Sequence, residues 1–106
     1  MNLDFYNTLG LCRRAGFISW GHDAAIQSIK SNKARICIIT ADASDRLKKE
    51  FERTVEYYKS SIPVIFIDDD MDRMRDAIGL RTAVITVNDE GFTNLLKKHI
   101  SNKGEV

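Results

Sequence analysis

Side chains that could carry out chemistry are few in this 106-residue sequence, and they stand far apart. His22 and His99 have no partner at metal-ligand spacing, and Cys12 and Cys37 each stand alone in an apolar pattern. None of the phosphate-loop, nucleophile-elbow or zinc-protease motifs occurs. The sequence therefore predicts a protein that is not an enzyme and needs no cofactor. It also predicts that both cysteines are reduced and buried, as expected in a reducing compartment.

The stretch DDDMDRMRD at 68–76 is a cluster of acidic residues that could suggest a Mg²⁺-binding site. It follows an expected strand, and α/β proteins often hold metal carboxylates there. The favoured interpretation is that the acids begin a helix, where they complement its dipole. No metal is therefore expected. A small enzyme or metal binder built on Asp68, Asp69, Asp70 and Asp72 ranks last among the possible functions, because no nucleophile accompanies these residues.

A candidate binding site lies in ISWGHDAAIQ, from Ile18 to Gln27, where a short strand meets a glycine and then a helix. A helix start offers unpaired N–H groups and partial positive charge, which favour anions and polar base edges. Gly21 allows another backbone to approach closely. Trp20 could stack on a base or only cover a sheet edge, and Asp23 could only stabilise the first helical turn. Residue type alone favours these structural roles.

The loop GLRT at Gly79–Thr82 is a second candidate. It joins an expected helix to an expected strand and places a leucine beside an arginine. An exposed Leu80 could wedge against a base, and the same leucine could instead be an ordinary buried anchor.

Composition limits the class of protein. One domain over 1–106 is expected, with 101–106 as a polar tail that frays. The net charge of +1 argues weakly against a nucleic-acid binder, although residues 1–35 are richer in Arg and Lys than in acids. No apolar run approaches the roughly 18 residues that span a membrane. The N-terminus does not resemble a signal peptide, so the cytoplasm is the expected location.

Apolar spacing predicts alternating helices and strands. Strands are expected at 17–20, 35–40, 63–67 and 82–87. Helices are expected at 4–15, 22–32, 44–59 and 69–78, with a last helix after Asn88 or Asp89. Predicted caps and stops are Ser44 or Asp42 before the third helix, and Gly16 and Gly79 after the first and fourth. The side chains predicted to face inward include Phe5, Leu9, Cys12, Ala25, Ile26, Ile29, Leu47, Phe51, Val55, Tyr58, Met71, Met74, Ile78, Phe92, Leu95, Leu96 and Ile100.

This alternation predicts an α/β fold, a three-layer α/β/α sandwich with a four-stranded mixed sheet. Strands 35–40, 63–67 and 82–87 are continuous apolar runs, as expected for strands covered on both faces. The segment FISW at 17–20 is short, so we expect it at a sheet edge, where it could lie antiparallel. Tyr57 and Tyr58 receive no function. One of the two is expected to face the core and the other to half-cover it.

The whole ordered pattern resembles a known family. The segments that carry it are LGLCRRAGFISWGHDAAIQSIKSNKARICIITADAS, YYKSSIPVIFI and RDAIGLRTAVITVNDEGFTNLL, within residues 5–100. In this order they resemble ribosomal proteins of the archaeal large-subunit seven-Ae and eukaryotic thirty-e kind, which bind kink-turn RNA. More narrowly they resemble the bacterial YlxQ-type members of that family. The family fold is the same three-layer sandwich.

The resemblance implies a position for the RNA face. The family's Gly, Asn, Glu and Lys positions fall on Gly21, Asp23, Ala24 and Gln27, so that only the glycine is kept. The loop positions are 80–82, and the turn 41–43 is expected nearby. The implied RNA contacts are Trp20, Gly21, His22, Asp23, Ala24, Gln27, Lys30, Lys33, Leu80, Arg81 and Thr82, with Lys30 and Lys33 on phosphates.

The leading hypothesis is a non-enzymatic RNA-binding protein, ribosomal or ribosome-associated, with a degenerate kink-turn motif. Its partner would be structured RNA, either kink-turn-like or ribosomal. The alternative is a protein–protein interaction module on the same fold, which the near-neutral charge favours, because fold alone does not set function.

Overall fold

The structure is a computed structural model that describes the backbone of residues 1–104 and the side chains of residues 1–100. Its helices are α1 (Leu3–Arg14), α2 (His22–Lys30), α3 (Asp45–Tyr57), α4 (Met71–Ile78) and α5 (Glu90–Gly104). Its strands are β1 (Ile18–Trp20), β2 (Ile36–Ile39), β3 (Val64–Phe66) and β4 (Val84–Val87). The tail expected at 101–106 is helical in backbone as far as Gly104. The rest of that expectation lies outside the described residues.

The strands form one mixed sheet in the order β1-β4-β2-β3. β4 pairs antiparallel with both β1 and β2, whereas β2 and β3 are parallel. Ile38 of β2 therefore faces Ile85 on one side and Ile65 on the other. The prediction of a four-stranded mixed sheet with a short edge strand is confirmed, and this strand is antiparallel and covers Ile18–Trp20 of the expected 17–20.

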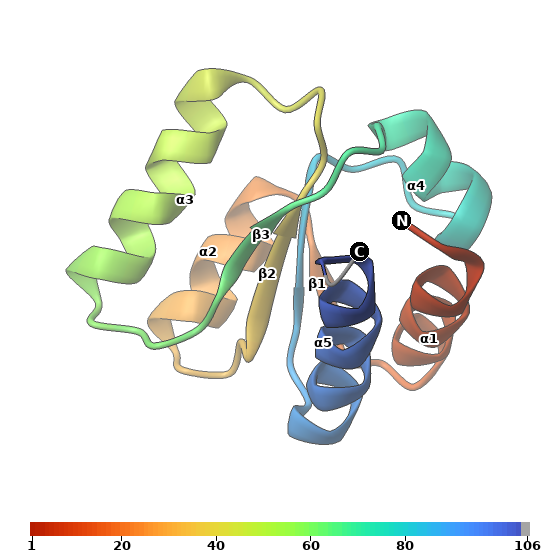
Figure 1. The fold of residues 1–106 in the computed structure, drawn as a ribbon. Coiled ribbons are helices and arrows are strands. Elements are labelled where there is room, and N and C mark those ends of the chain that lie inside the picture. Colours follow the sequence, from red (N-terminus) through yellow and green to blue (C-terminus); the bar gives the residue numbers. More distant parts are fainter. Residues whose placement is uncertain (105–106) are drawn as a thin grey trace.

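Two apolar cores lie on opposite faces of this sheet, because successive side chains of a strand point to opposite sides. Ile36 and Ile38 pack with α1, α4 and α5, whereas Cys37 and Ile39 pack with α2 and α3. Figure 1 shows the corresponding layers, with α2 and α3 on one side of the sheet and the other helices on the opposite side. The three-layer α/β/α sandwich is confirmed. Cys12 and Cys37 are buried free thiols, one in each core.

Helix ends follow the predicted capping chemistry. The Ser44 hydroxyl accepts the Leu47 N–H at 3.1 Å, and Asp89 accepts the Phe92 N–H at 2.9 Å. Gly79 ends α4 in the left-handed conformation at φ +79°. Among the described helices, none combines the length and apolar character needed to cross a lipid bilayer.

Two predicted inward positions, Tyr58 and Leu95, are wrong, and so is the expectation that one of Tyr57 and Tyr58 faces the core. Tyr58 is 41% exposed and Tyr57 is 77% exposed, so neither tyrosine faces the core. The physical reason is that α3 ends at Tyr57, whereas the predicted helix continued to residue 59. Lys59 already has the left-handed φ of +52°, so the helical spacing that would turn Tyr58 inward does not continue. Leu95 is 45% exposed because its neighbour Leu96 occupies the buried side of α5. One residue is about 100° around a helix, so both cannot face the sheet equally.

Candidate nucleic-acid interface

The start of α2 is shaped by the backbone of Gly21. This residue has φ +85° and ψ 165°, a region that is essentially restricted to glycine. A Cβ added there would meet nothing within 4 Å, so backbone conformation rather than space requires the glycine. Gly21 is the N-cap residue and has no side chain to accept the N–H groups of the first turn. Those donors are therefore open to a ligand.

Two loops lie beside the start of α2, at the end of the sheet where β1 and β2 finish and β4 begins. The Gly21 N–H donates to the Val84 carbonyl at 3.1 Å, and the Thr40 N–H donates to the Ala83 carbonyl at 2.9 Å. The Thr40 hydroxyl then holds Asp42 at 2.8 Å. The fold thus brings together the helix start, the turn 41–43 and the loop before β4, as the family resemblance implied. We call residues 20–24, together with Gln27 and Arg81, the Gly21 corner.

His22 lies between two carboxylates at this corner. Its Nδ1 is 2.8 Å from Asp23 Oδ1, and its Nε2 is 2.8 Å from Glu50 Oε2 of α3. A neutral imidazole carries one N–H, whereas the imidazolium carries two and can donate to both acids. The hydrogen bonds to Asp23 and Glu50 accordingly raise the pKa of His22 above its usual value. Protonation of the ring would bring the charge of this acidic corner closer to neutral.

Arg81 is the cation of the loop before β4, and it is already paired. Its Nε donates to Asp72 Oδ1 at 2.9 Å, and the guanidinium remains about half exposed. The hydrogen bond and charge of Arg81 lower the pKa of the Asp72 carboxyl. An RNA phosphate that used Arg81 would compete with this exposed ion pair, which is worth little in water.

The remaining residues of the corner are accessible. Trp20 ends the edge strand β1, pairs with Ile85 in register, and is 53% exposed. Asp23, Ala24 and Gln27 are also exposed, so their side chains can reach a ligand. An exposed tryptophan beside open N–H donors is suited to stacking on a base.

Leu80 and Thr82 do not present side chains to this surface. Leu80 is 7% exposed and packs in the core under α1, α4 and α5. Thr82 is 6% exposed, and its hydroxyl donates to the Val84 carbonyl at 2.9 Å. The expectation of an exposed Leu80 is wrong, and the buried-anchor alternative holds. The loop must bury an apolar side chain because it returns from α4 over that core.

Lys30 and Lys33 lie away from the corner. α2 has nine residues, so at about 1.5 Å per residue Lys30 stands roughly 12 Å along the helix from His22. Lys33 follows the turn after Asn32, which has φ +61°. The predicted face is therefore split, with the aromatic and acidic residues at one end of α2 and its lysines at the other.

Asp69 and Asp70 of the acidic stretch have structural roles. Asp70 caps α4 and accepts the Arg73 N–H at 2.8 Å. Asp69 accepts the Tyr6 hydroxyl and the Met1 ammonium, each at 2.6 Å. Burial would raise the pKa of Asp69, but these two hydrogen bonds lower it overall. Among the described residues, no group of three or more potential ligands is placed to hold a metal.

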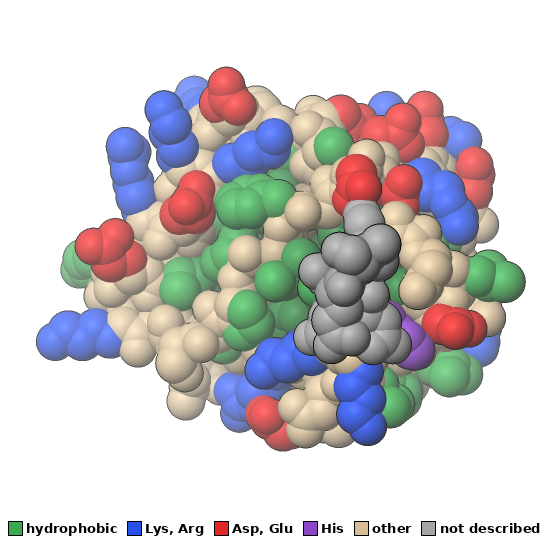
Figure 2. All heavy atoms as spheres, in the orientation of Figure 1, with side chains coloured by type: hydrophobic (Ala, Val, Ile, Leu, Met, Phe, Trp, Pro, Cys, Tyr) green, Lys and Arg blue, Asp and Glu red, His purple; other side chains and the backbone are tan. Residues whose placement is uncertain are grey.

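Surface charge is mixed over α3 and more acidic over α4. On the face seen in Figure 2, basic and acidic side chains are interspersed over α3, whereas acidic side chains gather over α4. The sequence of α3 contains four Lys or Arg residues and four acids, so this helix has no net side-chain charge. Any attraction of a polyanion to α3 must therefore come from individual cations and not from the helix as a whole.

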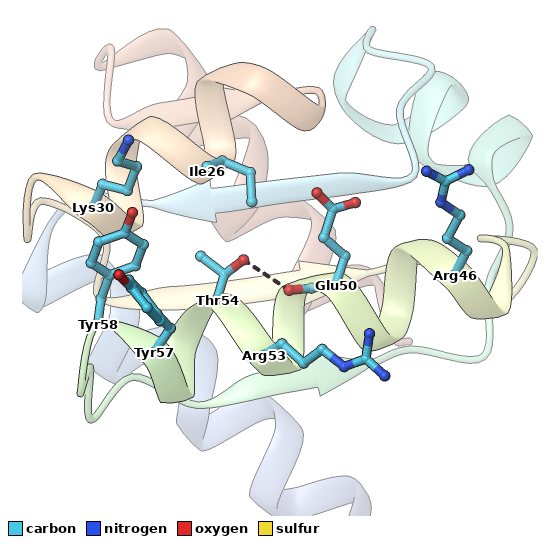
Figure 3. Close-up of a pocket in the computed structure, with 8 residues that line it drawn as sticks. All are labelled: Ile26, Lys30, Arg46, Glu50, Arg53, Thr54, Tyr57 and Tyr58. Carbon is cyan, nitrogen blue, oxygen red and sulfur yellow. Dashed lines mark hydrogen bonds between the residues drawn. The ribbon is translucent and has the colours of Figure 1, made fainter.

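Sequence reasoning missed a groove between α2 and α3. Its volume is about 480 Å³, and its lining is Ile26, Lys30, Arg46, Glu50, Arg53, Thr54, Tyr57 and Tyr58. Figure 3 shows the side chains of both helices around it, with Lys30 and Tyr58 at one end and Arg46 at the other. Arg46, Arg53 and Tyr57 are spaced at i, i+7 and i+11, which places them along one side of α3. This spacing was the feature of the sequence that could have predicted the groove.

The sequence matches a family of known proteins over most of its length. Residues 4–97 match the ribosomal protein L7Ae/L30e/S12e/Gadd45 family. A protein from Enterococcus faecium named RNA-binding protein YlxQ is 31% identical over 94 residues, which are 89% of this chain and 88% of that protein. Its namesake from Bacillus subtilis is 29% identical over 94 residues, covering 89% and 92% of the two chains.

Solved structures show the same fold. A protein of unknown function from Bacillus halodurans superposes with a TM-score of 0.83 at 26% identity, over 94% of this chain and 99% of the other. The Giardia lamblia 15.5 kDa RNA-binding protein superposes with a TM-score of 0.73 at 20% identity, over 94% and 84%. The second likeness concerns the fold alone. The resemblance found in the sequence is thus confirmed.

Proposed function

The chain belongs to the ribosomal protein L7Ae/L30e/S12e/Gadd45 family, and on this premise we propose that it is a non-enzymatic RNA-binding protein. Structured RNA is the ligand, and the Gly21 corner is its binding site. The names of the two bacterial relatives, which describe them as RNA-binding proteins, support this proposal.

The observation that carries the proposal is the open start of α2. A glycine-only backbone presents first-turn N–H groups with no side-chain cap, beside a half-exposed Trp20. Such donors suit phosphates and base edges, and the indole suits an unstacked base. These are the chemical needs of distorted or single-stranded RNA rather than of a regular duplex.

The ligand we propose is a kink-turn-like or ribosomal RNA bound through an altered recognition set. Family recognition uses an asparagine and a glutamate, which can satisfy the edges of sheared G·A pairs. Here the side chain of Asp23 can only accept hydrogen bonds, and the side chain of Ala24 can neither donate nor accept one. We therefore infer weaker, more electrostatic binding than in relatives that keep the full set, in association with the ribosome.

Equilibrium binding to matched RNAs tests the proposal. Fluorescence anisotropy would compare a kink-turn RNA, the same RNA with its G·A pairs replaced by Watson–Crick pairs, and a plain duplex. We expect a preference for the kink-turn RNA and a log–log salt slope of only a few units, at about 0.7 to 0.9 per neutralised phosphate. Equal affinity for all three RNAs, or no binding at low salt, would reject the proposal.

A second candidate function is a protein–protein interaction module. The observation that favours it is the pairing of charges at the corner, where Asp23 and Glu50 flank His22 and Asp72 neutralises Arg81. Cations that are already paired with carboxylates attract RNA only weakly. Such a surface is therefore less suited to RNA than one with free cations. Failure of the anisotropy test would move this function ahead.

The proposal includes no catalytic step, no cofactor and no metal, and it places the protein in the cytoplasm. It rests on the family and on the chemistry of the corner, which lacks a nucleophile paired with a base. Incubation of labelled RNA with the protein and Mg²⁺ should leave the RNA intact, and specific cleavage would overturn this part.

A further inference from the structure

We propose that the α2–α3 groove is a second binding site whose ligand is a short unpaired stretch of RNA, with a base stacked on Tyr57 and phosphates on Arg46, Arg53 and Lys30. The site is separate from the Gly21 corner. It rests on the proposed function only in taking the same class of ligand.

Tyr57 is the central feature of the groove. It is 77% exposed, although it is a large aromatic residue on a regular helix. Its ring lies 4.8 Å from that of Tyr58 at 82°, an edge-to-face contact that restrains it. A restrained ring with most of its surface in water is a stacking platform, since every base has a π face.

The cations that line the groove are available for phosphates. Lys30 Nζ lies 5.9 Å from the Tyr58 ring centroid, which keeps the ammonium at the groove. Among residues 1–100, no carboxylate lies within ion-pair distance of Lys30, Arg46 or Arg53, in contrast to Arg75 and Arg81. An unpaired guanidinium binds phosphate without first breaking an ion pair.

The one acid in the lining is already engaged. Glu50 accepts from His22 Nε2 at 2.8 Å, so it is directed to the His22 side of the groove. Thr54 donates its hydroxyl to the Glu50 carbonyl at 2.8 Å, and Ile26 adds apolar surface (Figure 3). The lining thus carries three cations, one acid that is hydrogen-bonded to His22, and an apolar contact, which complements a polyanion with aromatic bases.

Its shape selects an unpaired strand. The lining from Arg46 to Tyr57 spans eleven helical steps, or about 16 Å at 1.5 Å per residue. The groove of about 480 Å³ lies between neighbouring helices, so it can take part of an unpaired strand but not a double helix. Unpaired bases are also the part of RNA that proteins read by stacking.

Continuity with the corner favours RNA over a protein partner. α2 and α3 both begin at the same end of the sheet, which is the end where β1 and β2 finish (Figure 1). The His22–Glu50 contact lies between the corner and the groove. A strand leaving a structured RNA at the corner would follow α2 towards Lys30. The groove would then hold the unpaired flank of the same RNA.

Anisotropy with a labelled oligouridylate of about eight nucleotides tests the inference, a length within the site sizes of single-stranded binders. We expect Tyr57→Ala to weaken binding about tenfold, equivalent to ~1.4 kcal/mol. Tyr57→Phe should bind within about twofold of wild type because it keeps the ring. Arg53→Gln should reduce the salt slope by about 0.7, the contribution of one phosphate on a single strand.

Lys98→Gln is the matched control, because it removes an exposed cation from α5 on the opposite layer. It should leave the oligouridylate affinity and its salt slope unchanged. Circular dichroism should show all variants folded, since Tyr57 contributes little buried surface. Three results would each overturn the inference: no binding by the wild type, wild-type affinity for Tyr57→Ala, or equal losses for Lys98→Gln and Arg53→Gln.

Failure of this inference can be told apart from failure of the proposed function. A kink-turn RNA with blunt stems probes the corner, and the part of oligouridylate binding that is lost in Tyr57→Ala probes the groove. If only the blunt kink-turn RNA binds, the groove inference fails and the proposed function stands. If only the oligouridylate binds, in a Tyr57-dependent manner, the groove stands and the corner does not.

Discussion

Nε2 of His22 lies 2.8 Å from Oε2 of Glu50, and this contact joins the first turn of α2 to α3. The same ring stacks edge-to-face against Phe51 at 5.9 Å between centroids. The corner and the groove are therefore connected by one titratable side chain. Protonation of His22 neutralises acids that border both surfaces.

The first prediction concerns pH. The hydrogen bonds to Asp23 and Glu50 raise the pKa of folded His22 above the unfolded value of about 6.5. The stabilisation is then complete below that unfolded pKa and is lost as pH rises through the folded pKa. We expect the urea midpoint to fall with rising pH from about 6.5 upwards and His22→Gln to flatten this dependence. The control His99→Gln should retain it, and a slope that persists in His22→Gln would contradict the assignment.

The second prediction concerns Gly21. Its φ of +85° and ψ of 165° are costly for any residue with a Cβ, so Gly21→Ala should lower the free energy of unfolding by about 1–3 kcal/mol. Gly10→Ala is the control, because Gly10 lies in α1 with open space around its Cβ position. That substitution should instead stabilise by about 0.5–1 kcal/mol. Urea denaturation of both variants measures the difference, and equal effects would refute the backbone argument.

The third prediction concerns restoring the family's recognition set. Asp23, Ala24 and Gln27 are all exposed on α2, so Asp23→Asn, Ala24→Glu and Gln27→Lys can reach a ligand without disturbing the core. Each good base-edge contact is worth about 1–3 kcal/mol. The triple variant should gain at least about tenfold for a kink-turn RNA over a duplex, and Asp23→Asn alone should give part of this gain. No gain in anisotropy titrations would show that the face is wrong.

The fourth prediction concerns the ion pair of Arg81. Asp72→Asn removes the carboxylate that Arg81 contacts at 2.9 Å, so it should free the guanidinium and strengthen RNA binding at low salt. The salt slope should become steeper by about one phosphate contact, or 0.7 to 0.9. Arg75 contacts Asp72 at 3.6 Å and Asp76 at 3.3 Å, so Asp76→Asn, which removes a partner of Arg75 but not of Arg81, serves as the control. If both variants change RNA binding equally, Arg81 has no special role.

The fifth prediction concerns the thiols. Burial raises the pKa of Cys12 to about 11 and that of Cys37 to about 12. Because the thiolate is the reactive form, both should resist alkylation at neutral pH in the folded protein. Mass spectrometry after iodoacetamide should show modification only when urea is present. Rapid alkylation of either cysteine without urea would contradict this burial.

Much of the fold is determined by local pattern. The apolar runs ICII and VITV are the fully buried strands β2 and β4, and alternation along β2 sends Ile38 and Cys37 to separate cores. The roles of Ser44 as a helix cap and of Gly79 as a helix end could be predicted from the sequence. Each role depends mainly on the chemistry of that one residue. The family order of segments placed the corner at Gly21 for the same reason, since a strand, a glycine and a helix are consecutive in the chain.

The tertiary structure decided which side chains are free to act. Leu80 and Arg81 are adjacent in a loop, yet only packing over the α1, α4 and α5 core buries the first, and only Asp72 of α4 pairs the second. Likewise Lys30 and Tyr58 are distant in sequence and meet because α2 and α3 share one face of the sheet. Sequence patterns report a residue's preference for burial or charge. Long-range packing alone sets which partner satisfies that preference and which group is left exposed, because contacts across the sheet are made by residues far apart in the chain.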